Sequence, residues 1–364
     1  MSSYMIAAQA DFALNLLREV STDDRSCIVS PFSVAVTLSM VYAGAKERTG
    51  EEMGQLLANG APESEVHKYF GALLKSVTNG TNSSNTLETA NKVYVKKGSK
   101  VKDAFKEQIE GNYGGQFETV DFEDGKGTAE KINNFVKEAT HKKIRDLVKP
   151  DNFDKNTRHM GGQIRLKIHQ KSKFHVDAKN FKELEMMHLE AYFIYYKNAQ
   201  LKLLGMPYKG GKEFMFVLLP KERFGLTELL AQLDGKKLLK LIKKAGQRER
   251  EAEHPFFSQV VLPKFKLEAT HELNKPLTNM GMPTAFTISA NFERISGKKT
   301  SLLSKVMQKA VIEVNEEGTV AAAVTEGVVA DCASSKEYRF VADRPFCAFL
   351  IRDDTVLFSV IFRK

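Results

Sequence analysis

The sequence contains no tryptophan, few cysteines and no long apolar run. None of its apolar runs approaches the roughly 18 residues that a membrane-spanning helix needs, so we expect no membrane partner. The cysteines are odd in number and widely spaced, at Cys27, Cys332 and Cys347. This spacing predicts no disulfide framework and favours a reducing compartment such as the cytosol.

The sequence motifs of several enzyme classes are also missing. Residues 295–301 contain a lysine and a threonine but no upstream glycine, which excludes a phosphate-binding loop. There is no G-x-S-x-G nucleophile motif, no H-E-x-x-H, and no histidine pair beside two cysteines. We therefore expect no enzymatic activity, no metal and no cofactor.

Positive charge is plentiful, with a formal net charge of +9. In the lysine-rich stretch 234–246, one helical stripe is apolar and another is basic. The apolar stripe consists of Leu238, Leu239, Leu241 and Ile242. The basic stripe is either a solvated helix face or a patch for polyanions. Aromatic residues are not interleaved with it as in nucleic-acid platforms, so no nucleic-acid partner is expected.

Helices are predicted mainly in the first half of the chain and strands in the second. The predicted helices are 5–20, 30–45 with Ser30 as its cap, one starting at a Thr49–Glu52 capping box, and 131–148. The predicted strands are 91–98, 163–169, 213–220, 260–270, 310–318 and a hairpin over 347–362 turning at Asp353–Asp354. This order, without a linker, predicts a single α+β domain. The first helix is amphipathic rather than a signal peptide, which favours a cytoplasmic protein.

One segment near the C-terminus is unusual because it carries a single charge, Glu326, between Gly318 and Ala330. Read as a strand, it has one face of small uncharged residues: Thr319, Ala321, Ala323, Thr325, Gly327 and Val329. Such a face could enter between two existing strands without overpacking, whereas a buried charge would oppose entry. Gly318 could act as a pivot. The alternative is a loop of small residues without a role.

The segment belongs to a wider resemblance. Residues 309–325 resemble the hinge signature of the serpin family, and 340–351 resemble its C-terminal signature. Further segments follow the family in the same order, at 30–53, 132–148, 206–210 and 262–282. The resemblance implies an α+β serpin fold in one domain, 1–364, with a large central β-sheet A, two smaller sheets and about nine helices. It also implies an exposed reactive-centre loop at about 316–338.

The function implied by this resemblance is suicide inhibition of a target protease by a monomeric protein. The protease cleaves the loop and forms a covalent acyl-enzyme, and the loop then inserts into the main sheet and distorts the protease. The implied hinge is Glu316, Glu317, Gly318, Thr319, Val320, Ala321, Ala322 and Ala323. The implied sheet-opening region includes Ser30, Ser33 and Gln308.

The reactive bond follows from the family distance beyond the hinge glycine, which allows Asp331–Cys332 or Cys332–Ala333. Residues 329–334 resemble the reactive loop of a cowpox member of the family, which presents an aspartate to inflammatory caspases and granzyme B. This resemblance favours cleavage after Asp331. The implied subsite contacts are Val328, Val329, Ala330 and Ala333. If Cys332 is recognised instead, papain-like cysteine proteases or an elastase-type serine protease become the targets.

The sequence departs from the family pattern in three places. Residues 157–176 lack the asparagine and tryptophan of a family strand, Gln308 replaces a histidine, and Val360 replaces a common glycine. Either Gln308 acts as a substitute buried hydrogen-bonding group, or the altered strand near 159–172 slows insertion. In the second case the chain is a non-inhibitory serpin, a substrate or a binding or chaperone-like module. We expect inhibition because the hinge carries no bulky or charged block.

Overall fold

The computed structural model describes residues 3–78, 93–96, 100–114, 117–120, 124–139, 170–208, 212–250, 257–297, 302–314 and 338–364. Ten α-helices lie within these ranges, against about nine expected. They are α1 Ser3–Val20, α2 Pro31–Tyr42, α3 Glu47–Ala58, α4 Glu63–Thr78, α5 Asp103–Tyr113, α6 Gly125–Ala139, α7 Leu226–Gln232, α8 Gly235–Arg250, α9 Asn274–Asn279 and α10 Glu293–Ser296. No helix within the described ranges is both long and apolar enough to cross a bilayer.

The strands of the described ranges form one large sheet and several smaller ones. They are β1 Cys27–Val29, β2 Val93–Lys96, β3 Phe117–Val120, β4 Gln170–His175, β5 Phe181–Tyr192, β6 Ile194–Lys197, β7 Leu201–Pro207, β8 Glu213–Pro220, β9 Phe257–Pro263, β10 Phe265–Glu272, β11 Met307–Val314, β12 Tyr338–Val341, β13 Phe346–Arg352 and β14 Thr355–Phe362. The six-stranded sheet has the order β1-β14-β13-β8-β7-β6, and a four-stranded sheet has the order β12-β9-β5-β4. The pairs β10–β11 and β2–β3 are separate. The expected α+β architecture is confirmed.

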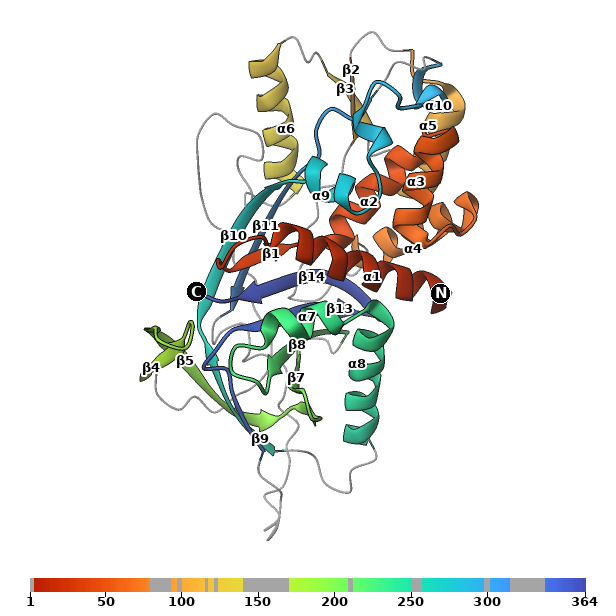
Figure 1. The fold of residues 1–364 in the computed structure, drawn as a ribbon. Helices are drawn as coiled ribbons and strands as arrows, with labels where there is room; N and C mark the ends of the chain where they lie inside the picture. Colours follow the sequence, from red (N-terminus) through yellow and green to blue (C-terminus); the bar gives the residue numbers. More distant parts are fainter. Residues whose placement is uncertain are drawn as a thin grey trace.

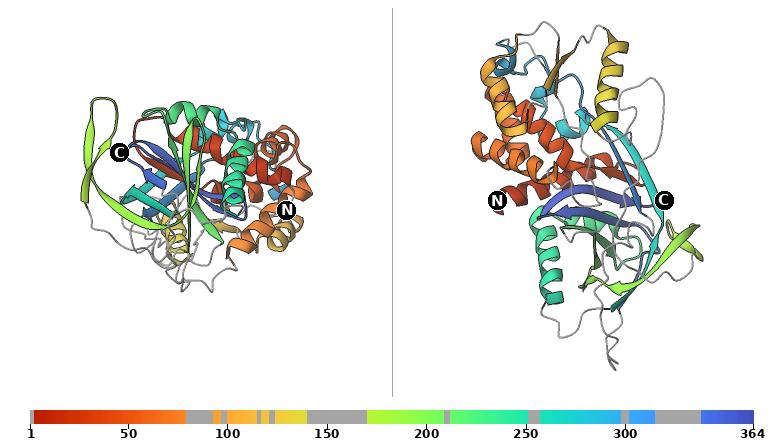
Figure 2. Two further views of the ribbon diagram at one scale, coloured as in Figure 1. Left: turned by 90° about the horizontal axis from the view of Figure 1, so that it is seen from below. Right: turned by 180° about the vertical axis from the view of Figure 1, so that it is seen from behind.

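The elements divide the molecule into two ends, joined by the long pair β10–β11 (Figure 1). Helices α2 to α6 gather at one end, and β9, β7, β8 and α8 at the other, an arrangement that the rear view repeats (Figure 2). Helix α1 and the hairpin β13–β14 lie between them. Of the two strands that flank the predicted reactive loop, β11 belongs to the pair that joins the ends, and β12 pairs with β9 at the end built mainly from strands.

Helix α2 forms as its sequence predicts. The side-chain oxygen of Ser30 accepts a hydrogen bond from the Ser33 N–H at 3.3 Å, and Pro31 occupies the first turn. A proline there loses no intrahelical hydrogen bond, because the first N–H groups of a helix have no partner. Most side chains of α2 are buried, so the helix is the central buried helix that its apolar composition predicts.

The predicted C-terminal hairpin is also confirmed. Strands β13 and β14 pair antiparallel, and the turn residues Asp353 and Asp354 have φ values of 48° and 62°. Two consecutive positive φ angles define the tight turn that matches strand twist, and aspartate tolerates this conformation. At the far end of the hairpin, the rings of Phe346 and Phe362 stack with centroids 5.1 Å apart. Local turn chemistry and an apolar core at the opposite end therefore fix this hairpin.

Two sequence predictions are wrong in ways that have clear physical causes. Residues 260–270 form two strands rather than one, because β9 ends at Pro263 and β10 starts at Phe265 in another sheet. Proline cannot donate to a ladder, and the last contact of this strand with β5 is the hydrogen bond from the Lys264 N–H to the Glu185 carbonyl at 2.8 Å. Apolar and polar residues do alternate along 260–270, but the segment passes from one sheet to another at Lys264.

The Thr49–Glu52 capping box is the second wrong prediction. Helix α3 begins at Glu47, so both residues lie inside it. The Thr49 hydroxyl accepts the Asn291 N–H at 3.0 Å, and Glu52 accepts the N–H and hydroxyl of Thr284 at 2.9 and 2.7 Å. Burial alone would raise the pKa of the Glu52 carboxyl, but these hydrogen bonds and Arg48 lower it overall. These two side chains therefore link α3 to residues 284–291.

The remaining predicted elements agree where the structure describes them. Residues 5–20 lie in α1, 213–220 match β8, and the middle of 91–98 is β2. The start of the predicted helix 131–148 lies in α6, which ends at Ala139. Residues 140–148 and the predicted strand 163–169 lie outside the described ranges, as do 315–318 of the strand predicted over 310–318.

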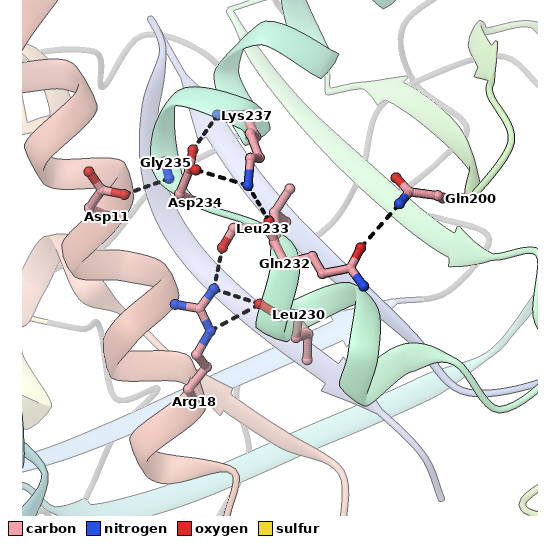
Figure 3. A network of polar contacts seen from close by, with 9 residues as sticks. All are labelled: Asp11, Arg18, Gln200, Leu230, Gln232, Leu233, Asp234, Gly235 and Lys237. Atoms are coloured by element: carbon pink, nitrogen blue, oxygen red, sulfur yellow. Dashed lines mark hydrogen bonds and ion pairs between the residues drawn. The ribbon is translucent and has the colours of Figure 1, made fainter.

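A polar network fixes the start of the basic helix α8 against α1 (Figure 3). The Asp11 carboxylate accepts the Gly235 N–H at 2.6 Å, so a residue of α1 supplies a cap to α8. Arg18 donates two hydrogen bonds to the Leu230 carbonyl, at 3.0 and 2.5 Å, and another to the Leu233 carbonyl. These contacts satisfy carbonyls at the end of α7, where cations are favourable.

Candidate functional site

The loop residues of the predicted site lie outside the described ranges. They are Glu316, Glu317, Gly318, Thr319, Val320, Ala321, Ala322, Ala323, Val328, Val329, Ala330, Asp331, Cys332 and Ala333. The structure does describe the two strands that flank them, β11 and β12, and the predicted sheet-opening residues Ser30, Ser33 and Gln308. These flanking elements define what the loop is attached to.

The two ends of the loop are attached to consecutive strands. Val314, the last residue of β11, pairs with Phe265, and Tyr338, the first residue of β12, pairs with Ser258. Ser258 and Phe265 are seven residues apart, so they are separated by at most about 25 Å. Each loop end lies about 5 Å from its partner, so Val314 and Tyr338 are at most about 35 Å apart. The 23 residues of 315–337 have an extended length of about 75–80 Å. The connection is therefore more than twice as long as the gap that it bridges.

Strand β11 has one edge without a partner among the described strands. It pairs with β10 from Phe265–Val314 to Glu272–Met307, and with no other strand of the described ranges. An unpaired strand edge presents a row of N–H and C=O groups that can receive another strand. Lys309 on β11 is itself held by Glu268 on β10, at 2.9 Å, and its side chain is only 8% exposed. Strand β11 is thus firmly held by β10.

Ser30 and Gln308 are joined by two hydrogen bonds although they are 278 residues apart. The Ser30 N–H donates to Gln308 Oε1 at 3.0 Å, and Gln308 Nε2 donates to the Ser30 carbonyl at 2.7 Å. Both residues are buried, with Gln308 6% and Ser30 4% exposed. Gln308 therefore has the geometry required of a buried hydrogen-bonding substitute for histidine, and it satisfies both backbone groups of the α2 cap residue.

Two further groups complete this cluster, and sequence reasoning missed them. His271, the cross-strand partner of Gln308, has its Nε2 2.8 Å from the Ile28 carbonyl oxygen. The Ser30 hydroxyl donates to the Leu357 carbonyl at 2.9 Å. The apolar alternation around His271 marks it as a strand position, but the pairing register that brings it beside Gln308 is a tertiary property. The cluster ties β10 and β11 to the segment between β1 and α2.

We expect Gln308→Ala to lower the free energy of unfolding by about 2 kcal/mol, because it leaves the buried Ser30 N–H without a partner and removes one of the two hydrogen bonds to the Ser30 carbonyl, which also accepts the Val34 N–H. The measurement is urea unfolding, followed by fluorescence and circular dichroism. Gln55→Ala is the matched control, since Gln55 lies exposed on α3. It should change the unfolding free energy by less than about 0.5 kcal/mol. Equal unfolding midpoints for Gln308→Ala and the wild type would contradict a structural role for this pair.

The other two departures from the family pattern also have places in the structure. Residues 170–172, the end of the altered stretch 159–172, lie in β4, which pairs with β5 in the four-stranded sheet. Residues 157–169 lie outside the described ranges. Val360 is 1% exposed in β14, between its register partners Ile28 and Ala348. A β-branched residue suits such a buried strand, so this change is accommodated.

Comparison with known proteins agrees with this architecture. The chain matches the family Serpin (serine protease inhibitor) over residues 7–360. Serpin B6 of Macaca fascicularis is 31% identical over 366 residues, which cover 96% of this chain and 95% of the relative. Leukocyte elastase inhibitor A of Rattus norvegicus is 32% identical over 370 residues, which cover 96% of each chain.

Solved structures show the same fold. The crystal structure of Serpin48, a highly specific serpin of the insect Tenebrio molitor, aligns with a TM-score of 0.79 at 29% identity, over 100% of this chain and 98% of that one. A tumour-suppressing serpin aligns with a TM-score of 0.86 at 23% identity over the full length of both chains. The chain therefore belongs to the serpin family of protease inhibitors.

Proposed function

We propose that this serpin is a suicide-substrate inhibitor of Asp-specific proteases, either granzyme B-like serine proteases or caspase-like cysteine proteases, cleaved after Asp331. The observation that carries the proposal is that β11, a strand fixed by its pairing with β10, leads directly through the hinge into the segment 319–329 with its small uncharged face. A strand that enters beside β11 would be continuous with it through the hinge at Gly318. We propose one inhibitory domain over the whole chain, acting as a monomer.

The proposed reaction begins as ordinary peptide-bond cleavage. The protease serine or cysteine attacks the Asp331 carbonyl carbon, the Cys332 amine leaves, and an ester or thioester joins Asp331 to the protease. The freed segment then enters the sheet with its small face inward, which avoids burying a charge. The uncut protein is kinetically trapped above this better-paired state. Covalent capture succeeds when insertion is faster than hydrolysis of the acyl-enzyme.

The preference for aspartate is supported by the likeness of 329–334 to the reactive loop of the cowpox serpin cytokine response modifier A. A protease that accepts aspartate needs a cation in its pocket, because an unpaired carboxylate is expensive to bury. A second candidate has support from the relatives named leukocyte elastase inhibitors. If Cys332 is the recognised residue, an elastase-type serine protease or a papain-like cathepsin is the target.

Two described cysteines support the proposal that the protein acts in a reducing compartment. Cys27 and Cys347 are free and buried. Burial raises the pKa of the Cys347 thiol to about 12, which keeps it in the unreactive thiol form. Neither residue therefore needs an oxidising environment for the fold.

The experiment mixes the purified protein with granzyme B or with an inflammatory-class caspase and separates the products on a denaturing gel. We expect a covalent band at the summed mass of the protease and this 40.8 kDa chain. Complete cleavage after Asp331 without a complex would instead support a non-inhibitory serpin, which serves as a substrate or as a binding or chaperone-like module. A complex that forms only with elastase would move the reactive bond to Cys332–Ala333.

A further inference from the structure

Two lysines face each other across neighbouring strands close to where the reactive loop ends. Lys197, at the end of β6, pairs in register with Lys202 on β7. Like charges directly opposite each other on a sheet are destabilising. Lys197 is exposed and Lys202 is half-buried, so water screens the pair only in part. A threonine at either position would stabilise the hairpin better.

Two more basic residues, Lys221 and Arg339, lie beside this pair through backbone contacts. Lys202 Nζ donates to the Arg339 carbonyl at 3.4 Å, which brings β7 beside β12. The Lys221 N–H donates to the Gln200 carbonyl, in the turn between the two facing lysines, at 2.8 Å. Burial, together with Arg344, Lys197 and Lys221, lowers the pKa of the Lys202 ammonium. We call Lys197, Lys202, Lys221 and Arg339 the loop-end cation cluster.

The positive charge of this cluster is not balanced locally. Asp343, the carboxylate that acts on Lys202, already pairs with Arg344 at 2.7 Å and with Arg223 at 3.6 Å. Within the described part of the chain, no carboxylate forms an ion pair with any member of the cluster. Lys197 and Lys221 both act unfavourably on the charge of Lys202, and no ion pair within the described chain compensates them, which points to an external partner.

The cluster also lies where a docked protease would be. Arg339 is eight residues beyond Asp331, so the two are at most about 28 Å apart along an extended chain. A folded protease of about 250 residues has a radius of gyration of about 18 Å. Tyr338, the first residue after the loop, packs on Tyr195 of β6 with ring centroids 4.8 Å apart. A protease that holds Asp331 in its active site would therefore overhang this surface.

We propose that the loop-end cation cluster is a docking site for an acidic surface patch beside the active site of the target protease. The proposal rests on the inhibitory function proposed above. Complementary charge steers a protein partner and raises its association rate by a factor of about 10 to 1,000, with a strong dependence on salt. The cluster would then favour target proteases with an acidic surface beside the active site over those without one.

The test compares Lys197→Glu/Arg339→Glu with the wild type, using an inflammatory-class caspase as the probe. Both side chains are exposed, and Lys197→Glu places opposite charges across the strand pair, so the fold should be retained. We expect the association rate to fall about 10-fold or more at low salt, and the difference to disappear near 0.5 M salt. The control Lys68→Glu/Lys275→Glu makes the same charge change on exposed residues of α4 and α9, and should leave the rate unchanged.

A free peptide of residues 324–337 provides a second control, because it contains the reactive bond but not the cluster. Its cleavage rate should depend much less on salt than cleavage of the loop in the intact protein. Equal complex formation by both double variants would overturn the docking site and leave the inhibitory function intact. Heparin is the probe for a polyanion site. If the wild type binds heparin, and Lys197→Glu/Arg339→Glu loses this binding without any change in the protease rate, the docking site is overturned in favour of a polyanion site. Failure of the caspase to cut the wild-type loop would remove both the caspase target and its docking site.

Discussion

Asp331→Ala should abolish the covalent complex with granzyme B or a caspase and lower the rate of loop cleavage about 10⁴-fold. The reason is that a protease pocket built to pair a carboxylate leaves its buried cation unpaired when the substrate lacks that group. The measurement is the second-order rate of complex formation, followed on a denaturing gel under excess inhibitor. The substitution should impair recognition by the protease and not the fold. Thermal unfolding of the uncut variant, which should be unchanged, checks this.

The loop offers a matched control for this substitution. Glu326→Ala removes the other acidic side chain of 318–331, five residues before the proposed reactive bond, and should change the rate less than about 3-fold. If Asp331→Ala still forms the complex while Cys332→Ala does not, the reactive bond is Cys332–Ala333. That result would contradict the Asp-specific function and support a papain-like or elastase-type target.

Ala321→Arg should convert the inhibitor into a substrate. Residue 321 lies on the small face that is proposed to enter the sheet, and a buried, unpaired guanidinium costs several kcal/mol. Insertion should therefore become slower than hydrolysis of the acyl-enzyme, so that cleaved protein accumulates and the active protease is released. The measurement is the number of inhibitor molecules consumed for each protease molecule inactivated, which should rise about 10-fold or more.

Ala322→Arg is the control, because it places the same side chain one residue further along, on the opposite face of the strand. It should trap the protease nearly as well as the wild type. Equal stoichiometries for Ala321→Arg and Ala322→Arg would show that neither face enters a packed sheet. In that case the small residues of this segment have no role in insertion, and the chain is better described as a non-inhibitory serpin.

The parts of the fold that the sequence predicts well are those fixed by neighbouring residues. The cap of α2 depends on Ser30, Pro31 and Ser33, and the C-terminal hairpin depends on the turn at Asp353–Asp354. The capping box at Thr49 failed because the same side chains satisfy a segment more than 230 residues away. Local patterns identify polar side chains that need partners, but they do not identify which partners the tertiary structure supplies.

In the candidate site, too, the sequence identifies residues of interest, and the tertiary structure determines their partners. Gln308 was singled out because it differs from the family residue, yet its two hydrogen bonds to Ser30 depend on how β11 lies against β1 and the residue that follows it before α2. The facing pair Lys197–Lys202 has no sequence signature beyond two lysines near a turn, since its repulsion arises from the register of β6 and β7. The small-residue face of 319–329 is a property of sequence alone and remains a prediction about insertion.

The most direct test of loop insertion is the thermal stability of the wild-type protein before and after a single cut in 324–334, measured by calorimetry at one pH and salt concentration. If the cut segment joins the edge of β11, the added strand should raise the unfolding temperature by roughly 10–30 °C. An unfolding temperature that stays the same or falls after the cut would contradict insertion, and with it the inhibitory mechanism proposed for this serpin.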